Sequence, residues 1–130
     1  MGRMANTPDF IAHLLELMRP SGRATARAMF GGHGVYVDGL FVAIVVADTL
    51  YLKTDDQTRS AYVQRSLEPF SYATKNGKVF AMSYHRAPDE AVEGAAAMHA
   101  WLRPALGAAL RNAQKKPRTA ASRRVRGRSV

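Results

Sequence analysis

The feature that most constrains the fold is a series of short, β-rich segments between residues 26 and 53. The segments are ARAMF, VYV, LFVAIVV and TLYLK, at residues 26–30, 35–37, 40–46 and 49–53. Asp38-Gly39 and Ala47-Asp48 separate the last three segments. Asp-Gly suits a type I′ hairpin turn, because both central residues of that turn need positive φ. The series therefore predicts an antiparallel meander of three or four strands.

A helix is predicted ahead of the meander. Thr7 is a good N-cap, Pro8 fits the first helical position, where no N–H is needed, and Asp9 meets the positive end of the helix dipole. Apolar residues then recur at helical spacing, at Ile11, Leu14, Leu15 and Met18. Pro20 and Gly22 end this pattern. The helix is expected to cover the sheet with its apolar side.

A second helix and a second hairpin are predicted after the meander. Thr54 and Gln57 have the spacing of a capping box, which predicts a helix over residues 54–65. Two strand-like runs then join at Asn76-Gly77, another hairpin signal. These runs would add two strands to the sheet.

The C-terminal part of the chain predicts helices. Pro88 starts a helical region, Gly94 is expected to break it, and Pro104 is expected to kink or restart it. Its candidate buried residues are Met98, Trp101, Leu102, Leu106 and Leu110. Together the elements predict an α+β fold, with helices packed on an antiparallel sheet of about five strands.

Charge is distributed very unevenly along the chain. The chain has 19 Lys and Arg residues and ten Asp and Glu residues. Eight of the basic residues and none of the acidic residues lie in residues 111–130. Residues 1–110 therefore carry a net charge of +1, and residues 111–130 carry +8. The eight are Arg111, Lys115, Lys116, Arg118, Arg123, Arg124, Arg126 and Arg128.

This basic segment has two alternative interpretations. Its cations can release counterions from nucleic-acid phosphates without reading a base sequence, or the segment is a solubilising end that binds nothing specific. It has too few apolar residues to offset the entropy of ordering. We therefore expect residues 1–112 to form one domain and residues 113–130 to be a disordered basic tail.

Three glycines lie close together in MFGGHGVYV, at Gly31, Gly32 and Gly34. A phosphate-binding glycine loop needs a helix N-terminus directly behind it, whereas strand-like residues 35–37 follow here. We therefore interpret the glycines as a structural turn or bulge, where the backbone passes close to a neighbour.

No pattern assigns a catalytic, cofactor or metal site. The chain has no cysteine, and no two of its four histidines are spaced to place both imidazoles on one side of an element. None of its serines lies in a G-x-S-x-G motif. We expect a non-enzymatic protein. One alternative is a ligand-binding or enzymatic cleft near His33, Tyr36, Tyr84, His85 and Arg86, and another is a homodimer formed through a sheet edge.

The apolar runs and the N-terminus predict no membrane association. The longest run, LFVAIVVA at residues 40–47, is far shorter than the ~20 residues of a membrane helix. The first residues have no apolar core of the kind that a secretory leader carries. We expect a cytoplasmic protein, and the absence of cysteine suits a reducing compartment.

Several blocks of the sequence resemble a known family. They are Arg27-Ala28-Met29-Phe30-Gly31-Gly32 with Gly34 and Tyr36, then Leu50-Tyr51-Leu52-Lys53, Pro69-Phe70 with Tyr72, Met82-Ser83-Tyr84, and Ala87-Pro88. In this order they resemble the TfoX N-terminal domain of the TfoX/Sxy regulators of natural competence, over about residues 10–110. The resemblance implies a compact α+β domain with a regulatory, non-enzymatic role, and it supplies no catalytic residues.

Two-domain members of that family act with a transcription activator of the cyclic-AMP receptor type. Residues 111–130 have no counterpart to their C-terminal domain, so the resemblance implies the fold and leaves competence control open. The leading prediction is a monomeric or homodimeric interaction module in transcription regulation. It would contact a protein of the transcription machinery through its folded surface and nucleic acid through its tail.

Overall fold

The computed structural model describes residues 5–29, 31–73, 77 and 79–122. Its helices are α1 (Pro8–Met18), η1 (Arg19–Ser21), α2 (Arg59–Val63), η2 (Asp89–Val92) and α3 (Ala95–Ser122), where η marks a 3₁₀ helix. Its strands are β1 (Ala24–Met29), β2 (Gly32–Val37), β3 (Leu40–Val46), β4 (Thr49–Lys53), β5 (Pro69–Ala73) and β6 (Val79–Arg86). The predicted α+β fold is confirmed, and the sheet has six strands rather than about five.

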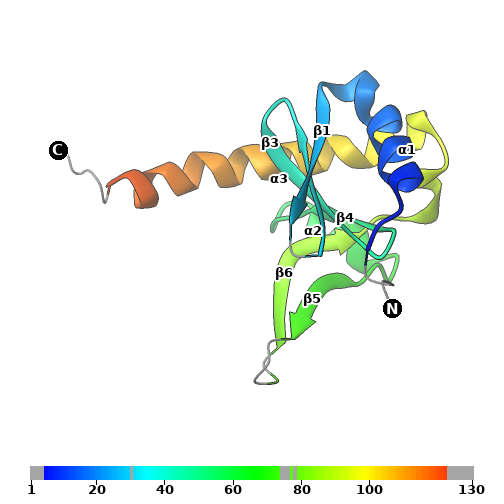
Figure 1. Cartoon of the computed structure of the whole chain (residues 1–130). Helices are drawn as coiled ribbons and strands as arrows, with labels where there is room; N and C mark the ends of the chain where they lie inside the picture. Colours follow the sequence, from blue (N-terminus) through cyan, green and yellow to red (C-terminus); the bar gives the residue numbers. More distant parts are fainter. Residues whose placement is uncertain (1–4, 30, 74–76, 78, 123–130) are drawn as a thin grey trace.

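All neighbouring strands of the sheet are antiparallel, in the order β1-β2-β3-β4-β6-β5. The first four strands form the predicted meander. The later hairpin joins the sheet with β6 beside β4, so that β5 forms an edge. Figure 1 shows α3 running across the sheet and continuing beyond its edge.

The β2–β3 turn of the meander has the predicted conformation. Both central residues of the β2–β3 turn have positive φ, 50° at Asp38 and 84° at Gly39. Ala47 and Asp48, in the β3–β4 turn, have φ values of 51° and 55°. The Asp48 carboxylate accepts a hydrogen bond of 2.8 Å from the Thr7 backbone N–H. The segment that caps α1 therefore also supports this left-handed turn.

One face of the sheet is covered by helices. Val35, Ala43 and Leu52 are cross-strand neighbours, so they share a face, and each is fully buried. The helices contribute Leu14, Met18, Met98 and Leu102, which are also fully buried. Burying each such large apolar side chain contributes about 1.5–3 kcal/mol. The predicted apolar stripe of α1 is confirmed, whereas Leu110 is exposed and its predicted burial is wrong.

The predicted capping box does not form. Thr54 is buried, with its hydroxyl 3.2 Å from His85 Nδ1, and α2 begins only at Arg59. The Asp55 carboxylate instead accepts a hydrogen bond of 3.0 Å from the Gln57 backbone N–H, and Thr58 Oγ1 accepts one of 3.0 Å from the Asp55 N–H. These bonds form a turn ahead of a shorter helix.

Helix α3 is longer than predicted. Gly94 separates η2 from α3 as expected, but Pro104 does not end the helix, which continues to Ser122. Residues 113–122 are therefore helical, and the predicted boundary at residue 112 does not coincide with the end of an element. Asn76 and residues 123–130 lie outside the described residues. No helix in the described ranges is long and apolar enough to cross a membrane.

Candidate functional site

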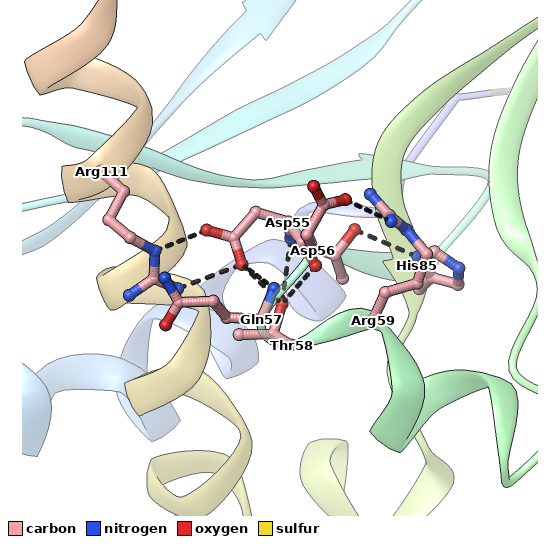
Figure 2. Close-up of polar contacts among 8 residues, drawn as sticks. Asp55, Asp56, Gln57, Thr58, Arg59, His85 and Arg111 are labelled. Carbon is pink, nitrogen blue, oxygen red and sulfur yellow. Dashed lines mark hydrogen bonds and ion pairs between the residues drawn. The ribbon is translucent and has the colours of Figure 1, made fainter.

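An ion pair between Asp55 and Arg111 ties the start of the basic segment to the domain (Figure 2). Arg111 Nε donates to Asp55 Oδ2 at 2.6 Å and Arg111 Nη2 donates to Asp55 Oδ1 at 3.1 Å. The Arg111 hydrogen bond lowers the pKa of the Asp55 carboxyl, and Asp55 raises the pKa of Arg111. This bidentate contact joins α3 to the loop after β4 at the point where the basic segment begins.

A cleft of about 190 Å³ lies beside this ion pair, between α3 and the loop after β4. Its charged lining residues are Lys53, Asp55, Asp56, Arg59, Arg111 and Lys115. Arg59 Nη1 contacts Asp56 Oδ1 at 2.8 Å, so each acid of the cleft pairs with an arginine. The pairing with Arg111 lowers the pKa of Asp55 and favours its ionised form, which has no proton to donate as a general acid. The cleft has four basic and two acidic residues, which suits an anionic partner better than acid–base chemistry.

His85 has a structural environment. The residue is buried on β6, with Thr54 Oγ1 3.2 Å from Nδ1 and the Tyr62 ring centroid 5.4 Å from its own. Burial lowers the pKa of His85, and the charge of Arg59 lowers it further. The ring is therefore held in its neutral form between β4 and α2.

His33 lies far from His85 in the sheet. It is on β2, which β3 and β4 separate from β6. His33 Nδ1 accepts a hydrogen bond of 2.9 Å from Asn6 Nδ2, which also donates to Val45 O at 2.8 Å. The described part of the chain contains no group of three or more His, Cys, Asp or Glu that could hold a metal ion.

The five residues of the expected ligand cleft do not converge. Tyr36 and Tyr84 lie on the face opposite His85, because neighbouring strand residues point to opposite faces. Arg86 Nε contacts Glu68 Oε2 at 3.1 Å near the β5 edge. The Phe41 ring lies between these two tyrosines, with its centroid 5.1 Å from that of Tyr36 and 5.8 Å from that of Tyr84.

Sequence reasoning missed several residues around these rings. Arg27 lies with its guanidinium carbon 5.9 Å from the Tyr36 ring centroid, and Lys53 Nζ lies 4.9 Å from that of Tyr84. The period-two alternation of the strands could have grouped these residues. Asp55 and Arg111, 56 positions apart, left no local signal.

Gly31 lies in a turn, and at Gly32 and Gly34 other atoms of the protein come close to the backbone. Gly31 has a φ of 77°, in the left-handed region. A Cβ on Gly32 would collide with the carbonyl oxygen of Val45, and a Cβ on Gly34 would lie 2.6 Å from Met29 Cε. The backbone therefore needs glycine at Gly32 because another backbone atom is close, and at Gly34 because side chains pack over it.

Comparison with known families gives one match. A family model of the TfoX N-terminal domain matches residues 16–109. The chain belongs to the TfoX N-terminal domain family. No curated protein matches it. The TfoX N-terminal domain match begins in α1 and ends in α3, so it includes the whole sheet. It stops just before Arg111, so the basic segment lies outside the matched residues.

Proposed function

We propose that this TfoX N-terminal domain protein is a non-enzymatic module of transcription regulation that contacts DNA through its basic C-terminal segment. The observation that carries the proposal is the charge of residues 111–130, +8 without one acidic residue, in a segment whose first part continues α3. The module would act in the cytoplasm, with a protein of the transcription machinery as the partner of its folded surface. The regulatory roles of longer family members support that part.

The geometry supports DNA contact because residues 111–122, the described part of the basic segment, continue α3 away from the sheet. Figure 1 shows the C-terminal part of α3 projecting past the sheet. The ion pair of Arg111 with Asp55 lies at the start of this projection. Cations held on a projecting helix can approach phosphates without desolvating the domain, and they release counterions as they bind. Binding of this kind is independent of base sequence and strongly dependent on salt.

The test uses the full chain with the seven cations from Lys115 to Arg128 replaced by Gln, called the tail-neutral variant. Arg111 is kept because it pairs with Asp55. Binding of labelled duplex DNA is measured at several salt concentrations. We expect the affinity to fall and the slope of log K against log salt to drop by about 0.9 for each phosphate that the substituted cations no longer neutralise.

A matched pair of double variants provides the control. Arg123→Gln/Arg124→Gln and Arg19→Gln/Arg103→Gln each remove two charges, and Arg19 and Arg103 are exposed on the folded part. We expect only the first to lower the slope, by about 1.8 if both contact phosphate. Equal slopes for the wild-type and tail-neutral proteins would refute the proposed DNA contact.

A further inference from the structure

The sheet face opposite the helices carries aromatic and basic side chains. Tyr36 pairs with Phe41 across β2 and β3, and Lys53 pairs with Tyr84 across β4 and β6. The helices pack on the other face, over Val35 and its neighbours. Cross-strand partners share a face, so we call the face with Tyr36 the aromatic face.

The rings of the aromatic face form a platform that remains partly accessible. The stacked rings of Tyr36 and Phe41 have an interplanar angle of 20°, and the Tyr51 and Phe70 rings meet with centroids 5.0 Å apart. Each of these four rings is half-buried, whereas Tyr84 beneath them is buried. Tyr36 and Phe41 already stack on each other, so a nucleobase would contact the parts of these rings that stay exposed, and contacts of this kind tolerate any base.

The charge of the aromatic face is positive. Arg27 and Lys53 lie over the rings of Tyr36 and Tyr84. No carboxylate among the described residues forms an ion pair with Arg27. The six strands contain no acidic residue. Arg86 shares this face as the cross-strand partner of Tyr51, and it pairs with Glu68 just before β5. The part of the face around Arg27, Tyr36 and Phe41 is thus the part complementary to an anion that also presents flat rings.

We propose that the aromatic face binds single-stranded nucleic acid, with bases stacked on Tyr36, Phe41 and Tyr51 and with Arg27 and Lys53 near phosphates. Antiparallel sheets that present aromatic side chains on an open face stack about two or three bases in this way. A duplex is a poor occupant, because its bases are already paired and stacked. The basic tail and a second copy of the chain are disfavoured by like charge. The inference rests on the proposed function and extends it from the tail to the folded domain.

The test measures the binding of one short labelled oligonucleotide, alone and annealed to its complement, in the tail-neutral background. Tyr36→Leu keeps an apolar side chain and removes the stacking ring. We expect it to weaken single-strand binding about fivefold or more. Arg27→Gln is expected to lower the single-strand salt slope by about 0.7. Arg103→Gln removes the same charge from α3 and should leave single-strand affinity within about twofold.

Thermal unfolding of each variant controls for folding, and Arg27 is exposed, so Arg27→Gln is expected to fold normally. Unchanged single-strand binding in both Tyr36→Leu and Arg27→Gln would overturn the inference while leaving the tail proposal intact. Equal losses in Arg103→Gln, a preference for the duplex, or full displacement by a poly-glutamate peptide would also overturn it. If Tyr36→Leu and Arg27→Gln weaken single-strand binding but the tail-neutral variant binds duplex DNA as the wild type does, only the tail proposal is overturned.

Discussion

The two faces of the sheet bury their side chains in different ways. On the helix-covered face, Val35, Ala43 and Leu52 are fully buried. On the aromatic face, Ile44 and Tyr84 are the large buried side chains among the described residues, and half-buried rings surround them. Helices close one face, whereas in the described part of the chain the other face is covered by its own side chains.

The two faces of the sheet are shielded from water by different kinds of side chain. The side chains of the aromatic face include tyrosines and long cations, whose polar ends can stay in water while their apolar parts cover the sheet. Aliphatic side chains of the other face have no such end and need the helices. Changes on the helix-covered face should therefore unfold the protein, and changes on the aromatic face should mainly alter its surface.

Leu52→Ala provides the largest expected effect. Leu52 is fully buried on the helix-covered face, beside Ala43 and His85. The cavity and the reduced burial should lower the free energy of unfolding by about 2–5 kcal/mol in urea denaturation. Val63→Ala, at a side chain that is 62% exposed, is the control and should change it by less than about 0.5 kcal/mol. A destabilisation by Leu52→Ala no larger than that of the control would contradict the role of this face.

Substitution of two neighbouring glycines compares backbone with side-chain crowding. A Cβ at Gly32 meets the Val45 carbonyl oxygen, which cannot move without disturbing β3, and we expect Gly32→Ala to destabilise the protein by about 2–3 kcal/mol. A Cβ at Gly34 meets side-chain atoms, the flexible end of Met29 and the edge of the Phe41 ring, which can shift more easily than backbone, and Gly34→Ala should destabilise by about 1 kcal/mol. The reverse order in urea denaturation would show that the aromatic face is the more rigid one.

Tyr62→Phe should stabilise the protein. The Tyr62 hydroxyl is buried and has no hydrogen-bond partner among the described residues, and burial raises its pKa. Removing an unsatisfied buried hydroxyl should stabilise the fold by about 1 kcal/mol, seen as a higher Tm. Tyr36→Phe removes a hydroxyl from a half-buried ring of the aromatic face and should leave the Tm nearly unchanged. A lower Tm for Tyr62→Phe would indicate a partner for the hydroxyl.

The smallest effect concerns pH and His85. Burial lowers its pKa in the folded state below the usual 6.5, so the unfolded chain takes up a proton more readily. Stability is therefore fully present above about pH 6.5 and falls as the pH drops below that value.

His85→Gln should weaken this dependence, measured as the free energy of unfolding between pH 7 and pH 5. His99→Gln, at an exposed position on α3, should not. A pH profile of His85→Gln identical to that of the wild type would place the pH dependence in other groups.

Much of the fold was predictable from local sequence rules. Asp38-Gly39 adopts the expected left-handed turn, and Thr7 accepts a hydrogen bond from the Phe10 N–H as an N-cap. Neighbouring residues of a strand point to opposite faces of the sheet, so Tyr84 and His85 cannot line one cleft on the same face. This alternation could be read from the sequence. The start of α2 could not be predicted, because Thr54 is buried with its hydroxyl beside His85, which lies 31 positions later in the chain.

By itself, the sequence determined the meander, its turns and the charge of the C-terminal segment, because backbone preference, side-chain alternation and charge are properties of neighbouring residues. Only the tertiary structure decided that β6 lies beside β4 and that Asp55 holds Arg111. It also decided which face of the sheet the helices cover. These features depend on contacts between residues far apart in the chain, whose partners no local pattern specifies.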